Sequence, residues 1–380
     1  MSGAAPPARH LVHGMGMAME APTWPVITAD EAEAVLALFP EAGRVERLCW
    51  HSPRPFSAAT LVAAECGDFV LKRHHSRLRS VAALVEEHAF IAHLRSAGLT
   101  VPEVLASAEG VTAVSHGDWT YELHRKAPGL DLYRDRQSWT PFLSAGHAHA
   151  AGVALARLHQ AACGFTAGER GAWPLVSSLT ILPAHDPIAA AEAYVAARPA
   201  LEEFLAGKPW RAELARLFAA LADGLADLLE RQPRLWTHND WHPSNILWSE
   251  DGTASAIFDF GLAAPTCALH DLATAIERTA IPWLELAGGS AADVETALAI
   301  LAGYRSVIAL TEDDVAGVLR LLPLIHIEFA LSEADYFAGI VGDDAQAQVA
   351  WQDYLVDHAD WFLGPEGRTF LRDLASGASS

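Results

Sequence analysis

The distribution of apolar residues changes at Pro128-Gly129, and this change limits the possible folds more than any other feature of the chain. Across 44–125, short apolar segments alternate with tight turns at 66–68 and 116–118, where glycine and aspartate occur together. Such turns between short apolar segments are typical of β-hairpins. One segment, 81–97, instead has apolar residues at helical spacing and stops at a glycine. The first third is therefore predicted to be a small sheet with one inserted helix.

After this point the pattern is mainly helical. Residues 210–231 repeat leucines at helical spacing, which predicts one long helix with a core-facing stripe. Helices are also predicted at 146–162 and 269–279, and only two short strands, 235–237 and 255–258, interrupt the region. The predicted divisions of this α+β chain are a flexible tail (1–25), an N-lobe (26–125), a helical C-lobe (126–372) and a second tail (373–380).

Charge and cysteine content exclude several classes of partner. The chain has 26 Lys and Arg against 47 Asp and Glu, a net charge of −21. This excess repels nucleic acids and anionic membrane surfaces, so we expect neither as a partner. The four cysteines form no C-x-x-C pair, and no apolar run approaches the roughly 18 residues that span a bilayer. These features predict a protein of the reducing cytoplasm.

Two polar loops carry residues suited to phosphoryl transfer. The first has the pattern H-x-D-x-x-x-x-N, formed by His238, Asp240 and Asn245, and a D-F-G triplet begins at Asp259, 14 residues after the asparagine. Phosphoryl transfer needs a carboxylate that orients the attacking hydroxyl, and an Asn with a second carboxylate to hold Mg²⁺ against the phosphates. Mg²⁺ prefers such oxygen ligands. We therefore predict Asp240 as the catalytic residue, with Asn245 and Asp259 as metal ligands.

With these motifs in this order, residues 35–340 resemble the aminoglycoside phosphotransferase and choline kinase-like family, relatives of protein kinases that phosphorylate small molecules. The resemblance implies a two-lobed protein kinase-like fold, with a small antiparallel-sheet N-lobe and a larger helical C-lobe, and ATP and Mg²⁺ as cofactors. It places the family's catalytic Asp on Asp240 and its metal ligands on Asn245 and Asp259. A further family feature, Asp-Leu-Ala, begins at Asp271. We expect this residue to cap its helix and brace the loop, or else to be a surface N-cap.

The resemblance also implies residues that bind the nucleotide. A strand lysine pairs with the phosphates in this family, and Lys72 is the candidate. Its partner is expected to be a Glu on the following helix. Glu87, 11 residues before Gly98, matches the family's spacing, with Glu86 as the alternative. Such a charge-assisted pair would hold the lysine side chain extended.

Two further segments are expected to contact the nucleotide. The hinge between the lobes, which reads adenine through backbone groups, resembles the segment from Leu123 to Arg125. The family often has a glycine-bearing loop over the phosphates, yet no glycine occurs between residues 44 and 66. The loop has two prolines instead, and Ser52, Ser57 or nearby backbone amides are the expected phosphate contacts. Another departure is Asn239, where many relatives have Gly.

A transition-metal site is a rival interpretation of the first loop. His238 and His242 are four residues apart, and with Cys267 and His270 they offer a set of nitrogen and sulfur ligands. Pro243 argues against a regular helix there, which would be needed to align the two histidines. We expect His238 to brace the catalytic loop instead.

The acceptor is favoured to be a small-molecule hydroxyl. Only 12 residues separate Asp259 from Asp271, too few for the peptide-docking segment that protein kinases place after D-F-G. A protein Ser/Thr acceptor is the alternative. A kinase-like module that binds a ligand without transferring phosphate is a third interpretation, but it has no chemical need for Lys72, Asp240, Asn245 and Asp259 together.

One acidic segment bears on the chemistry of the acceptor. Residues 311–360 contain 11 Asp and Glu and one Arg, a local balance of −10. Most of these are expected on a solvated helix face, but Glu328, Glu333 and Asp335 stand among apolar residues. In the family, the C-terminal helices wall the acceptor pocket. The resemblance thus favours an amine-bearing acceptor at these three residues: an amino sugar, a choline-like amino alcohol or an amino acid such as homoserine.

Overall fold

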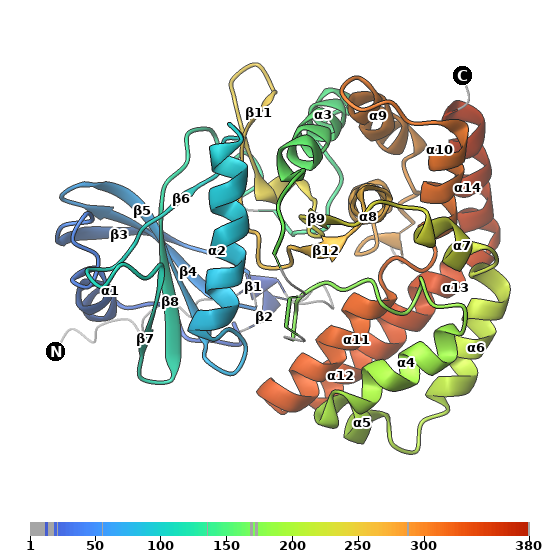
Figure 1. Ribbon diagram of the computed structural model, residues 1–380, viewed down its shortest axis with the longest axis horizontal. Helices are drawn as coiled ribbons and strands as arrows, with labels where there is room; N and C mark the ends of the chain where they lie inside the picture. The colour runs from blue at the N-terminus through green and yellow to red at the C-terminus, as the bar shows by residue number, and fades with distance from the viewer. Residues whose placement is uncertain are drawn as a thin grey trace, which may run out of the picture. The chain divides into compact units, whose positions relative to one another are not determined.

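The computed structural model describes residues 12–13, 19–20, 22–54, 56–134, 136–167, 170–171, 174–286 and 289–378. The chain forms two compact units (Figure 1). Unit 1 comprises Met1–Leu84 and Val104–Lys126, and unit 2 comprises Val85–Glu103 and Ala127–Ser380. The chain passes from one to the other close to the expected end of the N-lobe. Most of the helix expected at 81–97 belongs to unit 2, whereas we placed it in the N-lobe.

Unit 1 is built on a six-stranded sheet with the order β3-β4-β5-β8-β6, to which β7 adds by pairing with β8. Its strands are β3 (Val45–His51), β4 (Ala58–Ala64), β5 (Gly67–His75), β6 (Glu103–Val104), β7 (Ala113–His116) and β8 (Trp119–Arg125). Both predicted hairpins are present, because Gly67 (φ +135°) and Gly117 (φ +59°) adopt turn conformations that favour glycine. In this register, Lys72 on β5 lies directly opposite Glu122 on β8.

One face of the sheet is closed by helix α1 (Ala29–Leu36), which the sequence pattern did not reveal. Thr28 caps the helix and forms a reciprocal capping box with Glu31. Val35 and Leu36 are buried in a core shared with strand residues such as Phe69. Burial of this apolar face, rather than helix propensity, is what holds so short a helix in place.

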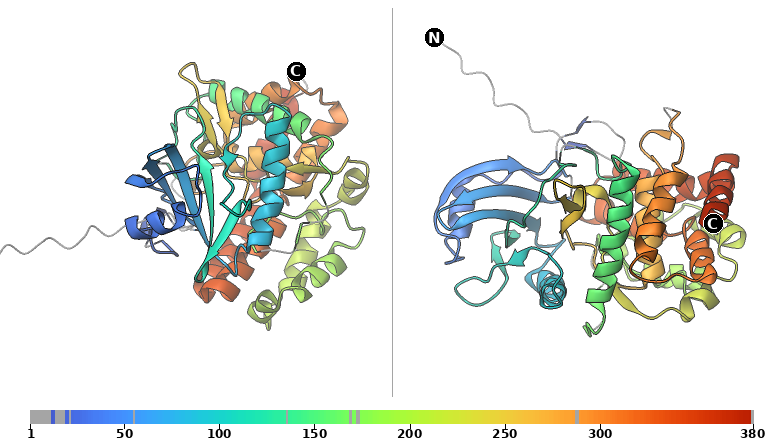
Figure 2. Two further views of the ribbon diagram at one scale, coloured as in Figure 1. Left: turned by 60° about the vertical axis from the view of Figure 1, so that its left-hand side comes forward. Right: turned by 90° about the horizontal axis from the view of Figure 1, so that it is seen from above.

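Unit 2 is mainly helical (Figure 1). Its helices include α2 (Val81–Ser96), α3 (Ala145–Ala162), α4 (Pro187–Ala196), α5 (Pro199–Leu205), α8 (Ala268–Ala280), α9 (Val294–Arg305), α10 (Glu312–Leu321), α11 (Ile327–Tyr336), α12 (Asp344–Val349) and α13 (His358–Leu363), with π-helical turns η3 (Phe337–Val341) and η4 (Ala350–Asp357). Helices α3 and α9 lie side by side (Figure 2). Gly152 and Gly303 make this approach possible, because a Cβ at either would collide with the backbone of the facing helix.

The prediction of one long helix at 210–231 is wrong, because this segment forms two helices. Helix α6 (Trp210–Leu221) ends before Gly224, and α7 (Leu225–Glu230) begins after it. Gly224 has φ +69°, a left-handed conformation that ends an α-helix. The leucine stripe continues through both helices, with Leu214 and Leu228 buried, so its periodicity hid the break.

The predictions for the two ends of the chain also need correction. Strands β1 (Val12–His13) and β2 (Met19–Glu20) pair antiparallel inside the expected tail 1–25, whose residues up to 21 otherwise lie outside the described part. At the other end, α14 (Pro365–Ala378) extends into the expected tail 373–380. Phe370, Leu374 and Ala378 recur every four residues and are buried, which anchors this helix to its end.

Four short strands frame the two polar loops of unit 2. Strand β9 (Leu235–Thr237) pairs with β12 (Ala264–Thr266), and β10 (Ile246–Trp248) pairs with β11 (Ala254–Ile257), so two strands were missed from the sequence and two were confirmed. The 3₁₀ turn η1 (Pro243–Asn245) lies between β9 and β10. Across the described ranges, no helix combines the length and apolar character needed to cross a bilayer.

Candidate active site

The loop that carries Asp240 is held in place by hydrogen bonds to Asp271, which lies on the first turn of α8. One carboxylate oxygen of Asp271 accepts from the backbone N–H of His238 at 2.9 Å, and the other from that of Asn239 at 2.8 Å. His159 Nε2 lies 3.0 Å from the first of these oxygens. Burial alone would raise the pKa of Asp271, but these partners hold it below its ordinary value. The expected brace is confirmed. The expected cap is wrong, because Cys267 is the N-cap and Asp271 is fully buried.

His238 joins this loop to the one that carries Asp259. Its Nε2 lies 3.0 Å from the carbonyl oxygen of Phe258, while its Nδ1 accepts from the backbone N–H of Asp240 at 3.2 Å. One nitrogen donates and the other accepts, as in neutral imidazole. Burial lowers the pKa of His238, which agrees with that form. The bracing role expected for His238 is therefore borne out by its contacts.

Asp240 and Asn245 are brought together, as the motif predicts. Asn245 Nδ2 donates to the backbone oxygen of Asp240 at 2.9 Å and to its Oδ2 at 3.1 Å. The other carboxylate oxygen, Oδ1, forms an ion pair with Arg278 Nη1 and lies 3.5 Å from His242 Nε2. The Asp240 side chain is 20 % exposed, so the carboxylate is held yet reachable. Asp259 follows Phe258, whose N–H donates to the backbone carbonyl oxygen of Asn245 at 3.1 Å, and Asp259 has φ +64°.

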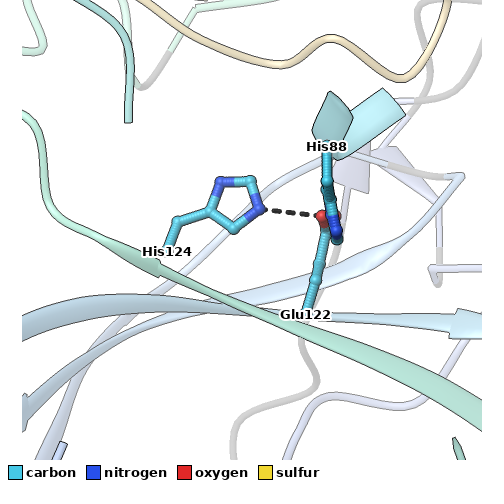
Figure 3. A group of neighbouring side chains, drawn as sticks. All are labelled: His88, Glu122 and His124. Atoms are coloured by element: carbon cyan, nitrogen blue, oxygen red, sulfur yellow. Dashed lines mark hydrogen bonds and ion pairs between the residues drawn. The ribbon is translucent and has the colours of Figure 1, made fainter. Parts of the chain in front are cut away.

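In unit 1, Lys72 is paired with a residue that the sequence analysis missed. Lys72 Nζ lies 3.7 Å from Glu122 Oε1, and His74 Nε2 lies 3.1 Å from the same oxygen. Glu122 also contacts His124 Nε2 at 2.8 Å (Figure 3). Burial would raise the pKa of Glu122, but His124 and Lys72 hold it well below its ordinary value. The cross-strand position opposite Lys72 was the signal that could have found it.

Other residues predicted to bind the nucleotide have structural contacts inside their own units. In unit 2, Glu87 is buried and lies 3.4 Å from Arg170 Nη2. In unit 1, Ser52 Oγ accepts from the N–H of Arg54 at 3.3 Å, and Ser57 immediately precedes β4. The Leu123 carbonyl accepts from the N–H of Leu105 at 2.8 Å, and Arg125 Nη2 lies 3.7 Å from Glu41 Oε2.

The three acidic residues predicted for the acceptor differ sharply in their surroundings. Glu328 accepts from the backbone N–H groups of Thr180 and Ile181, both at 2.6 Å, and from two hydroxyls, so its carboxylate braces segment 178–181. Burial raises the pKa of Asp335, which Arg198 partly offsets. Within the described ranges, both carboxylate oxygens of Glu333 are buried without a hydrogen-bond partner. Burial raises the pKa of Glu333 to about 8, against the opposing charge of Arg278.

A pocket lined in part by Asn239, the neighbour of Asp240 in the chain, contains residues that the sequence did not single out. It is narrow, with a cavity volume of about 10 Å³, and Glu277, Arg278, His326, Phe329 and Tyr354 are among its lining residues. The Arg278 guanidinium is only 3 % exposed and lies over the rings of Trp139, at 5.2 Å, and Phe329, at 5.1 Å. The one available signal was the Glu-Arg pair within the apolar helix α8.

Comparison with known proteins gives a consistent result. The sequence model of the phosphotransferase enzyme family matches residues 56–312. Homoserine kinase of Zymomonas mobilis subsp. mobilis is 23 % identical over 314 residues, which cover 81 % of this chain and 87 % of that protein.

Solved structures resemble most of the chain. An aminoglycoside phosphotransferase from Alicyclobacillus acidocaldarius covers 94 % of this chain and 97 % of its own, with TM-score 0.54 and 18 % identity. An amicoumacin kinase, solved with AMP-PNP and Ca²⁺, covers 91 % and 93 % with TM-score 0.56 and 16 % identity. A microcompartment-associated aminopropanol kinase covers 92 % and 99 % with TM-score 0.55 and 18 % identity. The predicted α+β protein kinase-like fold is confirmed.

Proposed function

Because the chain belongs to the phosphotransferase enzyme family, whose enzymes act on small-molecule hydroxyl groups, we propose that it transfers the γ-phosphate of ATP, with Mg²⁺, to a hydroxyl of a small amine-bearing molecule. The observation that carries this proposal is the setting of Asp240. Its carboxylate is one-fifth exposed and is fixed by Asn245 on one oxygen and Arg278 on the other. An acceptor hydroxyl that donates to this carboxylate is oriented for in-line attack on the phosphate.

Asn245 and Asp259 are proposed to hold the metal. Both hydrogen bonds from the Asn245 side chain use its nitrogen, which leaves the carbonyl oxygen for a cation. With the Asp259 carboxylate this gives two oxygen donors on loops tied together through Phe258, a set that suits Mg²⁺. When bound, Mg²⁺ neutralises charge on the transferred phosphate.

Several residues remain proposed contacts of the nucleotide. In unit 1, Lys72 takes the phosphates, and its ion pair with Glu122 keeps the ammonium group in position. Ser52, Ser57 and the backbone from Leu123 to Arg125 remain proposed contacts. Glu87 in α2 remains the proposed acidic residue of unit 2, although Arg170 is its neighbour there.

Glu333 is proposed to recognise an amine on the acceptor. Its two oxygens lack hydrogen-bond partners among the described residues, and burial favours the uncharged form. An ammonium group supplies both the donors and the opposite charge that a buried carboxylate needs. Glu328 is less suited, since its carboxylate already accepts four hydrogen bonds.

The test is an ATP-consumption screen with and without Mg²⁺ over aminoglycosides, amino alcohols, amino acids including homoserine, and neutral sugars. The proposal expects Mg²⁺-dependent consumption with at least one amine-bearing alcohol, and consumption roughly 10²–10⁴-fold slower with the Asp240→Asn variant. Consumption restricted to neutral sugars would contradict amine recognition. Tight MgATP binding without turnover on any acceptor class, including a mixture of Ser/Thr peptides, would favour a ligand-binding module.

A further inference from the structure

Three side chains of unit 2 converge outside the proposed catalytic and Mg²⁺ residues. Glu277 comes from α8, His326 precedes α11, and His358 begins α13. One nitrogen or oxygen atom from each lies within 4.8 Å of the other two. His358 Nδ1 and Glu277 Oε1 are 3.5 Å apart. The cluster thus joins three helices that are distant in sequence.

Among the described residues, the three side chains each have a buried polar atom without a hydrogen-bond partner. Glu277 Oε1, His326 Nδ1 and His358 Nδ1 are all buried and unpaired within the part of the chain that the structure describes. Glu277 and His326 are each only 2 % exposed. Buried polar atoms are nearly always hydrogen-bonded, so three unpaired atoms pointing at one place indicate an absent partner.

The hydrogen bond of His326 Nε2 fixes the tautomer of the ring. His326 Nε2 lies 3.0 Å from the carbonyl oxygen of Leu355, which can only accept, so this nitrogen carries the hydrogen. The lone pair is therefore on Nδ1, the ring nitrogen that remains for a ligand. A ring N–H bonded to a backbone carbonyl is the usual way in which a metal-binding histidine is oriented.

We propose that Glu277, His326 and His358 form a binding site for a divalent transition-metal ion of the Zn²⁺ class. Bonds of about 2.0–2.2 Å in a tetrahedral site separate neighbouring ligand atoms by about 3.3 Å. The 3.5 Å separation of His358 and Glu277 already matches this, and small side-chain rotations bring in His326. Two imidazoles and one carboxylate suit Zn²⁺ or Co²⁺, whereas Mg²⁺ and Ca²⁺ prefer oxygen alone.

The local charges favour a divalent cation. Arg278 pairs with Asp240 and is near Glu333. Burial raises the pKa of Glu277 to about 8, and a bound divalent ion would favour the ionised carboxylate at neutral pH. Glu277 and His326 also line the narrow pocket next to the catalytic loop, so a water in that pocket would complete the coordination of the ion. Metal binding does not depend on the proposed phosphotransfer.

The experiment is a Co²⁺ titration of the full chain, stripped of metal by a chelator and kept in millimolar Mg²⁺ to occupy the oxygen site. We expect one equivalent to give the strong visible absorption of four- or five-coordinate Co²⁺, and Zn²⁺ to abolish it. Glu277→Gln and His358→Gln should each weaken binding at least about tenfold. His185→Gln, in an exposed trio with Asp227 and Glu230, is the matched control and should bind as wild type.

Absence of this absorption in the wild-type protein would overturn the proposal, as would unchanged affinity in either folded variant. Circular dichroism shows whether each variant is folded, and only a folded variant is used to judge metal affinity. The two substitutions lie on different helices, and Glu277→Gln preserves the shape of the side chain. The readout needs no turnover. A protein that binds Co²⁺ but phosphorylates nothing upholds the metal site and contradicts the proposed function, and the reverse result does the opposite.

Discussion

Replacing Asp271 by Asn should destabilise the protein far more than an ordinary polar substitution. The two oxygens of Asp271 accept three hydrogen bonds, from the backbone of His238 and Asn239 and from the His159 ring. Asparagine retains one oxygen, so at least one buried N–H faces an amide NH₂ group, and the remaining bonds end on a neutral acceptor. With about 1.5–3 kcal/mol for each hydrogen bond to a charged group, we expect a loss of about 3–5 kcal/mol in the free energy of unfolding.

The assay is urea unfolding of wild type and variant, with Asp293→Asn as the matched control. Asp293 caps α9 by accepting from the N–H of Thr296 at 3.1 Å, and Asn is an equally good cap, so the control should be nearly neutral. The pKa of Asp271 is below 3.8 in the folded protein, so its contribution is present above pH 3.8 and is lost as the pH falls through the folded value. A loss below about 1 kcal/mol in the free energy of unfolding at pH 7 would refute this reasoning. So would a difference between wild type and Asp271→Asn that does not become smaller in acid.

Three further predictions test other parts of the account. Asp259→Ala should abolish Mg²⁺-dependent nucleotide binding; unchanged calorimetric affinity would count against its role. Because the pKa of Glu333 is raised to about 8, binding of an amine-bearing acceptor at pH 7 should release a proton, seen by calorimetry in buffers of different ionisation enthalpy, and not in Glu333→Gln. Burial lowers the pKa of His270 from 6.5 to about 4, so neutral His270 is favoured in the fold. The free energy of unfolding should therefore fall by up to about 3 kcal/mol as the pH is lowered from 6.5 to 4. The His270→Leu variant should lack this part of the pH dependence.

The sequence revealed those parts of the site whose residues are close together along the chain. Asp240 and Asn245 are five residues apart, and their hydrogen bonds are local, so the order and spacing of the motif together with the preceding strand predicted that they meet. The brace from Asp271 was also predicted, because it belongs to a family pattern. Its burial was not predicted, since that depends on His159 from α3, more than 100 residues away in the chain.

The missed residues depend on tertiary contacts. Glu122 acquires its role only through the register of β5 and β8, which sets it opposite Lys72. Arg278 is an ordinary helix residue until folding places it against Asp240. Likewise, His326 and His358 have no recognisable spacing, because they meet Glu277 only when three helices pack.

The wrong helix predictions have a different cause. Apolar periodicity is insensitive to a single change in backbone direction, so the leucines of 210–231 masked the left-handed turn at Gly224. Small residues near the end of the chain suggested a tail, whereas Leu374 and Ala378 pack into the core of unit 2. At the end of the chain the deciding quantity was burial, which sequence composition alone does not give.

The turnover of Asp240→Asn is the most direct test of the central claim, that this carboxylate orients and deprotonates the acceptor hydroxyl. With the acceptor found in the screen, kcat should fall roughly 10²–10⁴-fold, the contribution of a positioned proton acceptor. MgATP affinity and the thermal midpoint, measured beside the exposed control Asp251→Asn, should show that the variant is folded and binds nucleotide. Near-wild-type turnover in a folded Asp240→Asn protein would contradict the account.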